Sequence, residues 1–376
     1  MKAATSLLLF AVLGLLVLGI VTLVSASTGQ PEARYLIMQP IWAGIGLVAC
    51  AIAACLNYQF LKKIWWVMLL LAVTLLALVW VPGIGMAKKG AARWIGHGGV
   101  GLQPSEFAKV ALIISLAWYC HRFQRHMDTF FRGLCVPAAG VGVVLFLIFR
   151  EPDVGTTLVL AGVSGLMLLV AGVRWRYVAP PFLVGLSAIA LFVAHDPLRS
   201  DRVYAWLHPE ETRLDKGMQT YQSVAAFGSG GVKGVGLGEG RQKLGFVPEH
   251  HTDFIFAVIG EEMGLVATLS VLTAFLVILV CGVYIAWNAA DTFGMLLACG
   301  VTFLIAFQVL VNVGVVTGSL PNKGLALPFL SYGGSNLVVM LASVGLVINV
   351  GRNASTQPLI PARDEAFDDM IAPNQV

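Results

Sequence analysis

A carboxylate that could take a proton stands at the junction of a polar and an apolar segment. Asp253 follows Thr252, which can cap the helix predicted by the apolar segment, so Asp253 falls in the first helical turn. The helix dipole there favours the ionised carboxylate, whereas partial burial opposes ionisation. A carboxylate held between these effects could act as a general base. The alternatives are a plain N-terminal helix acid and a zinc site shared with His250 and His251.

Three cations, Arg93, Lys109 and Lys323, could bind an anionic ligand. Lys109 lies three residues after Glu106, a spacing that places both side chains on one helix face. The two could form an internal ion pair that locks the helix, or Glu106 could orient Lys109 toward the anion. Trp94, beside Arg93, taken alone is typical of an aromatic residue at the membrane interface.

Two further segments combine polar residues with signs of a helix start. Asp153 lies between two apolar runs, where it could cap the second run or contact a ligand. In 321–336, two prolines and two adjacent glycines indicate an interrupted helix. Non-helical backbone at membrane depth is tolerated where it is buried in protein or lines a cavity. The amides and hydroxyls of this segment, that of Ser331 among them, could therefore meet a ligand, with Lys323 at the cavity mouth.

The elements that carry these residues are predicted to be membrane helices. Of the 376 residues, 12% are charged and 58% are hydrophobic, which is too little polar surface to cover a soluble protein. A membrane span needs about 20 apolar residues, and the apolar runs lie at 5–25, 36–55, 64–82, 104–120, 134–149, 155–172, 177–195, 253–284, 293–317 and 326–350. The predicted fold is therefore all-α, with one ten-span membrane domain over 1–350 and a disordered cytoplasmic tail over 351–376.

The distribution of lysine and arginine orients these spans. The two residue types are more numerous at the span ends on the side of the N-terminus, which places both termini in the cytoplasm. One large extracytoplasmic loop, 196–252, then joins the seventh and eighth spans, and its glycine-rich second half is expected to pack closely over the membrane surface. Glu261 and Glu262, inside the eighth span, are expected to be paired structurally, because carboxylates near hydrocarbon are costly.

Charge and cysteine content exclude other classes of protein. The net charge of +4 is too weak for a nucleic-acid-binding surface. The six cysteines lie in or beside apolar runs and form no CxxC pair, so neither a disulfide framework nor a cysteine metal site is indicated. The clustered glycines lack the flanking strand and helix of a dinucleotide-binding motif.

At these residues the chain resembles the SEDS family (shape, elongation, division and sporulation) of bacterial ten-span membrane proteins. The matching motifs follow the family's order over residues 22–340 and occupy 25–27, 93–95, 103–109, 152–157, 221–223, 228–231, 248–257 and 323–335. The segment 242–244 before Pro248 looks more like the division branch, FtsW, than the elongation branch, RodA. Glu151 and His250 depart from the residues that are common in the family.

The resemblance implies a peptidoglycan glycosyltransferase that acts on lipid II, the undecaprenyl-diphosphate-linked disaccharide-pentapeptide. Asp253 matches the family's essential aspartate and would deprotonate the 4-hydroxyl of an incoming lipid II. The cations would stabilise the diphosphates, and a divalent cation, Mg²⁺ or Mn²⁺, could share that task. The substrate-binding residues expected on this basis are Arg93, Trp94, Glu106, Lys109, Asp153, Lys323 and Ser331.

The resemblance also implies partners and a location. The chain is expected to work on a growing glycan strand with a class B penicillin-binding protein as transpeptidase, among other division proteins, in the bacterial cytoplasmic (inner) membrane at the septum. The rival functions are a lipid II flippase, an elongation polymerase of the RodA type and a non-catalytic scaffold. A transporter would show paired broken helices in corresponding halves, whereas the sequence indicates one strong break, near Lys323.

Overall fold

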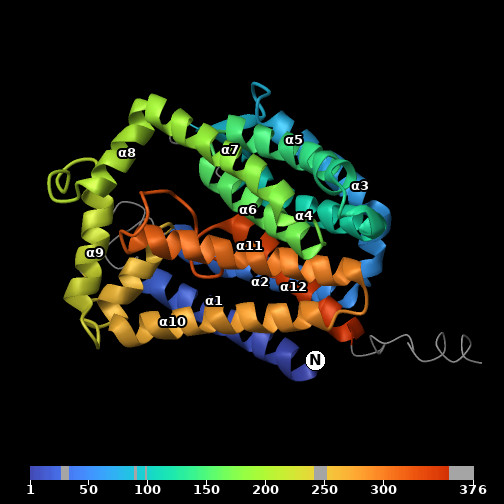
Figure 1. Ribbon diagram of the computed structural model, residues 1–376. Helices are drawn as coiled ribbons and strands as arrows, with labels where there is room; N and C mark the ends of the chain where they lie inside the picture. Colours follow the sequence, from blue (N-terminus) through green and yellow to red (C-terminus); the bar gives the residue numbers. More distant parts are fainter. Residues whose placement is uncertain (27–33, 89–90, 98–99, 241–251, 355–376) are drawn as a thin grey trace, which may run out of the picture.

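The computed structural model of the chain describes residues 1–26, 34–88, 91–97, 100–240 and 252–354, and it is mostly helical (Figure 1). The α-helices are α1 (Lys2–Ala26), α2 (Arg34–Cys55), α3 (Leu61–Leu78), α4 (Pro104–Arg122), α5 (Val136–Arg150), α6 (Val154–Val170), α7 (Trp175–His195), α8 (Pro197–Leu207), α9 (Met218–Gly230), α10 (Ile255–Trp287), α11 (Thr292–Val316) and α12 (Gly334–Ala354). Short 3₁₀ turns at Tyr58–Phe60 and Gln124–His126 and a π-helical turn at Phe131–Cys135 join some of them.

Every predicted apolar run falls on one of ten long helices, α1 to α7 and α10 to α12. Within the described residues, eight helical stretches are long and apolar enough to cross a membrane, and α6 is a shorter apolar helix of 17 residues. The helical membrane architecture is confirmed, while the number of ten spans and their orientation stay predictions. Pro104 occupies the first turn of α4, as expected. The tenth helix begins at Gly334 rather than at 326, because 321–333 is non-helical.

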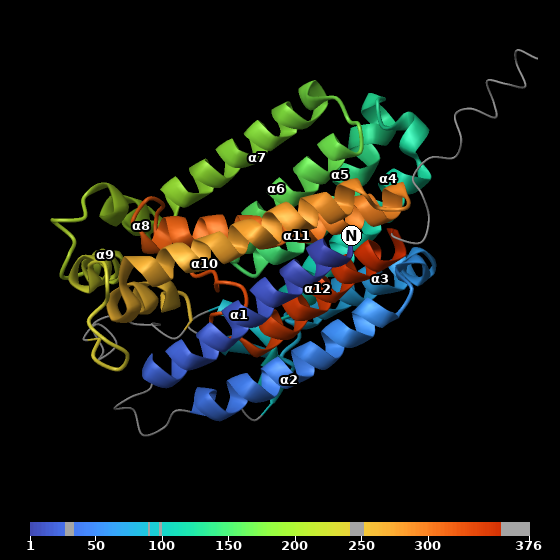
Figure 2. The ribbon, with the colours of Figure 1, turned by 90° about the horizontal axis from the view of Figure 1, so that it is seen from below.

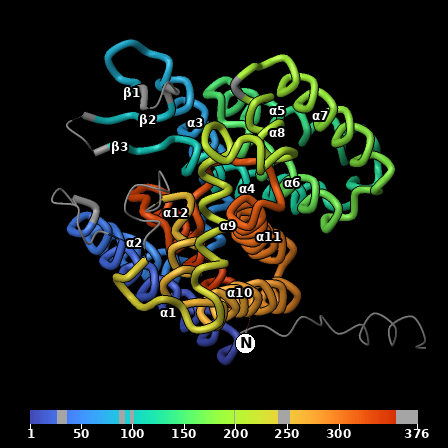
Figure 3. The backbone as a smooth tube through the Cα atoms, turned by 90° about the vertical axis from the view of Figure 1, so that its left-hand side faces the viewer, coloured from blue at the N-terminus to red at the C-terminus, as the bar shows by residue number. Residues whose placement is uncertain are grey.

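The all-α prediction is wrong between α3 and α4. Strands β1 (Gly85–Lys88), β2 (Ala91–His97) and β3 (Val100–Leu102) form an antiparallel sheet in the order β1-β2-β3. Trp94 pairs with Met86 in the sheet, and its ring packs over Gly101, where a Cβ would lie 3.0 Å from the ring. The sheet contacts α4 through β2 and α12 through β3, and Figure 3 shows it at the upper left of the view. Such short strands carry too few residues for their alternation to stand out in the sequence.

The loop expected over 196–252 also contains regular structure. Helices α8 and α9 form most of its described part and lie at one end of the helix bundle, on the left of Figure 1. This end, which also holds the starts of α4, α10 and α12, is called the loop end below. Figure 2 shows the long helices running from it toward the opposite end.

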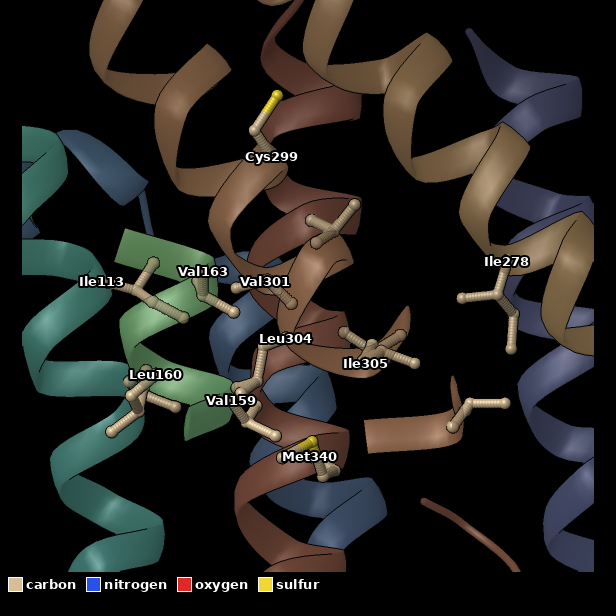
Figure 4. Packing of buried hydrophobic residues seen from close by; sticks show 14 of the residues in the cluster. Ile113, Val159, Leu160, Val163, Ile278, Cys299, Val301, Leu304, Ile305 and Met340 are labelled. Atoms are coloured by element: carbon tan, nitrogen blue, oxygen red, sulfur yellow. The ribbon is translucent and has the colours of Figure 1, made fainter. Parts of the chain in front are cut away.

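The core lies around α11, which packs against α4, α6, α10 and α12. Figure 4 shows its buried side chains interlocking with those of the neighbouring helices, among them Ile113, Leu160, Leu304 and Met340. By contrast α7 buries none of its side chains in the structure and exposes many large apolar ones. A helix that is apolar on its outward face suits contact with lipid.

Helix α10 is not the single uninterrupted helix that its apolar run predicts. Gly264 has φ 74° and ψ −168°, which divides the helix into an outer segment, 255–263, and a longer segment, 265–287. The chain therefore has a second break besides the one near Lys323. The expectation of a single break was wrong.

Candidate active site

Asp253 precedes α10 at the loop end, and its carboxylate lies against the backbone of Gly324. A Cβ added at position 324 would stand 2.6 Å from Oδ2 of Asp253, closer than non-bonded atoms approach. Only glycine therefore leaves room for the carboxylate here. Gly324 directly follows Lys323 in the chain, so the carboxylate of Asp253 lies against the segment that carries this lysine.

Two buried polar side chains hold the backbone on both sides of this contact. Asn312, on α11, donates from Nδ2 to the carbonyl of Asp253 at 2.8 Å and to that of Leu325 at 2.6 Å. Ser331 donates from Oγ to the carbonyl of Thr252 at 2.5 Å and accepts a hydrogen bond from the amide of Leu327 at 2.8 Å. The two segments that form the site are therefore fastened to each other through their main chains.

Ser331 and Thr252 thus have structural contacts that the sequence did not predict. The hydroxyl of Ser331 makes both bonds within the protein, so in this structure it positions Thr252, and a direct bond to substrate stays a prediction. Thr252 does not cap α10, since Phe254 occupies the N-cap position and the helix begins at Ile255. Asn312 was missed altogether, and its only signal was an amide side chain inside an apolar run that also contains Gln308.

Lys323 points toward the start of α6. Its Cε lies 3.1 Å from the place where a Cβ of Gly155 would be. Asp153 caps α6, as predicted, and accepts hydrogen bonds from the amide of Thr156 at 3.2 Å and from its hydroxyl at 2.9 Å. Burial lowers the pKa of Lys323 to about 8, and Asp153 acts against this shift. The cation is thus held beside a carboxylate in a poorly hydrated place, where an anionic ligand would be attracted strongly.

Arg93 completes the cluster from strand β2. Its Nε donates to the carbonyl of Glu151 at 2.9 Å and its Nη2 to that of Pro152 at 2.7 Å. These bonds fasten the sheet to the turn that carries Asp153. They use two of the five N–H donors of the guanidinium, and the other donors can bind a ligand.

Glu151, the departure from the family pattern, is fully buried in this turn. Neither carboxyl oxygen has a hydrogen-bond partner in the part of the chain that the structure describes. Burial raises the pKa of Glu151 to about 8, Asp153 adds to the shift and Arg93 opposes it. The carboxyl group is therefore mainly protonated at pH 7 and adds little negative charge to the cluster.

Glu106 and Lys109 form a buried ion pair in the first turns of α4. The Nζ–Oε2 distance is 2.6 Å, and the Lys109 side chain is 1% exposed. The spacing predicted this pair, which agrees with the ion-pair alternative. No described contact joins it to Asp253, Lys323 or Arg93, so a bond from Lys109 to an anionic ligand stays a prediction.

Two arginines on α8 that the sequence reasoning passed over belong to the surroundings of Lys323. Arg199 and Arg202, like Arg93, contribute to the lowered pKa of Lys323 by charge repulsion. Helix α8 is held to the segment after α11 by a hydrogen bond from Trp206 Nε1 to the carbonyl of Gly318, at 2.9 Å. Charged residues in a loop follow no helical or strand periodicity, so the sequence did not predict that these arginines lie near Lys323.

The site offers few side chains that could bind a metal ion. The described residues contain no group of three His, Cys, Asp or Glu side chains placed to hold a metal ion. The predicted zinc ligands His250 and His251 lie outside the described residues, as do 242–244 and Pro248. A metal site made of three protein side chains is thus not formed within the described part of the chain.

The comparisons with known proteins agree on a family. The model of the FtsW/RodA/SpoVE family, described as cell cycle proteins, matches residues 4–356. The chain is 41% identical over 346 residues to a probable peptidoglycan glycosyltransferase FtsW of Geobacter metallireducens, covering 90% of this chain and 92% of that one. It is 40% identical over 355 residues to the stage V sporulation protein E of Bacillus subtilis, covering 92% and 96% of the two chains.

Solved structures give the same result. A chain of a peptidoglycan synthase complex that coordinates polymerization and crosslinking superposes with a TM-score of 0.76 at 30% identity, covering 93% of this chain and 98% of that one. The rod shape determining protein RodA of Thermus thermophilus superposes with a TM-score of 0.68 at 29% identity, covering 92% and 96%. With its mostly helical bundle and the cluster around Asp253, the chain is a multi-pass membrane protein. It belongs to the FtsW/RodA/SpoVE family.

Proposed function

We propose that this protein is a peptidoglycan glycosyltransferase of the FtsW type, which polymerises lipid II into glycan strands for septal cell-wall synthesis. The relatives named FtsW support this activity. The observation that carries the proposal is the placement of the Asp253 carboxylate against Gly324, next to Lys323. It puts the proposed base against the segment that carries a cation, and the transfer of a sugar from a diphosphate uses both groups.

The reaction needs one proton transfer and one displacement. Asp253 accepts the proton of the 4-hydroxyl of the incoming lipid II sugar, and the hydroxyl oxygen then bonds to C1 of the growing glycan. The bond from C1 to the diphosphate oxygen breaks, and polyprenyl diphosphate leaves with the bonding electrons. Lys323 and Arg93 stabilise the negative charge that develops on this leaving group. Asp153 holds Lys323 in place by its charge.

A divalent cation would supply further stabilisation of the diphosphate. Mg²⁺ is often held by one or two carboxylates together with substrate phosphates, so a site with few protein ligands fits this use. Each step above is assigned to residues of the chain itself, and the cation remains a proposal.

The partner and the location follow from the family. We propose that a class B penicillin-binding protein crosslinks the strands, in keeping with the similarity to a chain of a peptidoglycan synthase complex. Other division proteins would join the two in the inner membrane at the septum. The expected topology places ten spans in the bilayer, both termini in the cytoplasm and the loop end outside.

Polymerisation of labelled lipid II by the purified complex with its penicillin-binding protein tests the proposal. Wild type should give long glycan strands, and a penicillin-binding protein without a transglycosylase domain should give none alone. A folded complex that makes no polymer, with Mg²⁺ or with Mn²⁺, contradicts the proposal. If such a complex instead moves lipid II across vesicle membranes, the protein is a flippase.

A further inference from the structure

The backbone groups released by the break in α10 form hydrogen bonds with a distant segment of the chain. In an unbroken helix the amides of Leu265 and Val266 would bond the carbonyls of Glu261 and Glu262. Here the amide of Leu265 donates to the carbonyl of Gly231 at 2.9 Å, and that of Val266 to the carbonyl of Val232 at 3.4 Å. The four backbone groups that the break releases would be costly inside a membrane protein if they had no partner.

The same segment also supplies donors for the two carbonyls. The amide of Val235 donates to the carbonyl of Glu261, and that of Gly236 to the carbonyl of Glu262, both at 3.0 Å. The segment 231–236, called the glycine clamp here, therefore replaces both missing helical bonds. It follows α9 directly, so α9 and the outer segment of α10 are joined through their main chains.

The clamp requires glycine because the backbones touch. Gly234 has φ 79°, and a Cβ on it would lie 2.2 Å from the carbonyl oxygen of Glu262. Gly264 has φ 74°, and its Cβ would lie 2.4 Å from the amide nitrogen of Gly234. Residues that carry a side chain rarely adopt such φ values. This gives a specific reason for Gly234 in the glycine-rich half of the loop, which was expected only to pack closely.

A second contact fixes the outer segment to the first helix. Ser25, at the end of α1, donates from Oγ to Oε2 of Glu262 at 2.5 Å. Glu262 is 2% exposed, so this hydrogen bond lies inside the protein. The outer segment is therefore held by the glycine clamp on one side and by α1 on the other, and Asp253 stands two residues before its start.

We infer that the glycine clamp and the bond between Ser25 and Glu262 position Asp253 for proton transfer, so that Gly234, Ser25 and Glu262 are positioning residues of the active site. The inference rests on the proposed function. A displacement of a reacting group by about 1 Å can cost on the order of 100-fold in rate. The glycine clamp thereby affects turnover through the position of Asp253.

The test compares Gly234→Ala with Gly228→Ala, which lies on α9 with no atom within 4 Å of the added Cβ. Polymerisation kinetics and hydrogen exchange are measured on folded complexes of each. We expect Gly234→Ala to lower kcat about tenfold or more, to leave the KM for lipid II within about twofold and to lose exchange protection at Leu265 and Val266. Gly228→Ala should match wild type in all three.

Ser25→Ala and Glu262→Gln give a second route in case Gly234→Ala does not fold. Ser25→Ala removes the donor and should lower kcat at unchanged KM, whereas Glu262→Gln keeps an acceptor and should retain most of the activity. An unchanged kcat per folded molecule in Ser25→Ala, or in Gly234→Ala with the exchange protection lost, overturns the inference. Failure of the proposed function is a separate result, because wild type and Gly228→Ala would then also make no polymer.

Discussion

The two ends of the helix bundle are built differently. At the loop end the backbone is irregular, with a break in α10, a non-helical stretch over 321–333 and a sheet between α3 and α4. Two ionisable groups with shifted pKa values, the half-buried Lys323 and the buried Glu151, lie there. At the opposite end, short turns join regular helices.

The opposite end has its own carboxylate, Asp291, which is held by several hydrogen bonds. Lys62 Nζ lies 2.5 Å from its Oδ2, and Tyr58 donates to its Oδ1 at 2.7 Å. The amide of Gly294 and the side chain of Gln59 donate as well, at 3.0 and 3.2 Å. Burial raises the pKa of Asp291, but these hydrogen bonds outweigh it and hold the pKa below its usual value.

The comparison separates a carboxylate held in a network of hydrogen bonds from the one that we propose as the base. Asp291 is surrounded by donors and stays ionised, so it makes a poor base and a good fastening point for α3 and α11. The carboxylate of Asp253 lies against the backbone of Gly324, in the segment that carries Lys323. We expect the same residue type to serve different purposes at the two ends, and the following changes test that difference.

The largest effect among the neighbours of Asp253 is expected from Gly324→Ala. The new Cβ would meet Oδ2 of Asp253 at 2.6 Å and displace the carboxylate. We expect kcat for glycan polymerisation to fall on the order of 100-fold. Gly140→Ala, where an added Cβ meets no atom within 4 Å, is the matched control. Equal activity of the two variants would show that the carboxylate does not need this position.

Lys323→Met should have the next largest effect. It removes a half-buried cation from the proposed diphosphate site, and a charge-assisted hydrogen bond contributes about 1.5–3 kcal/mol. We expect the KM for lipid II to rise about tenfold or more, measured by polymerisation at varied substrate. Lys216→Met, which breaks an exposed ion pair with Asp201 in the same loop, should leave KM unchanged. A similar KM for both variants contradicts a role of Lys323 in binding.

The pH dependence of KM should show a smaller effect of the same cluster of charged groups. Lys323 loses its positive charge and Glu151 gains a negative one as the pH rises through about 8. Both changes weaken anion binding, so KM should rise several-fold from pH 7 to pH 9, as measured by initial rates at each pH. Lys323→Arg combined with Glu151→Gln removes both titrations and should flatten the profile. A profile as steep as wild type in the double variant would rule out these groups as its cause.

Glu151 also makes folding stability depend on pH. Its pKa is raised from 4.5 to about 8 in the folded protein, so the unfolded chain releases the proton first as the pH rises. The stability present below pH 4.5 is therefore lost between pH 4.5 and 8. We expect the Tm difference between Glu151→Gln and wild type to grow over this range in thermal unfolding scans, in favour of the variant. A constant difference would mean that Glu151 is already ionised in the folded state.

Much of this structure could be predicted from local patterns. Apolar runs indicated the positions of the long helices and Pro104 marked the start of α4. A cap of α6 was one of two alternatives for Asp153, and the structure shows it, while substrate binding by Asp153 stays a prediction. The interrupted segment before α12 followed from its prolines and glycines. Each of these features depends on residues close together in the chain.

The remaining features depend on distant partners. The break at Gly264 is stable because amides and carbonyls of 231–236 replace its missing bonds, and no local pattern shows that pairing. Asn312 is an unremarkable amide until the fold brings Asp253 and Leu325 to it. Arg199 and Arg202 approach Lys323 only after α8 is folded back over the site. Proximity of this kind is a tertiary property, which composition and periodicity do not encode.

The most direct test of the account compares the two carboxylates by the same substitution. Asp253→Asn and Asp291→Asn are each measured for polymerisation of lipid II per folded molecule and for thermal stability. We expect Asp253→Asn to lose at least about 100-fold in kcat with little change in Tm, as for a general base. Asp291→Asn should keep its kcat and lose about 1–3 kcal/mol of stability, since it weakens a network of hydrogen bonds. Full activity in a folded Asp253→Asn variant would contradict the assignment of Asp253 as the base. It would also contradict the claim that the carboxylate at one end serves catalysis and the one at the other end serves stability.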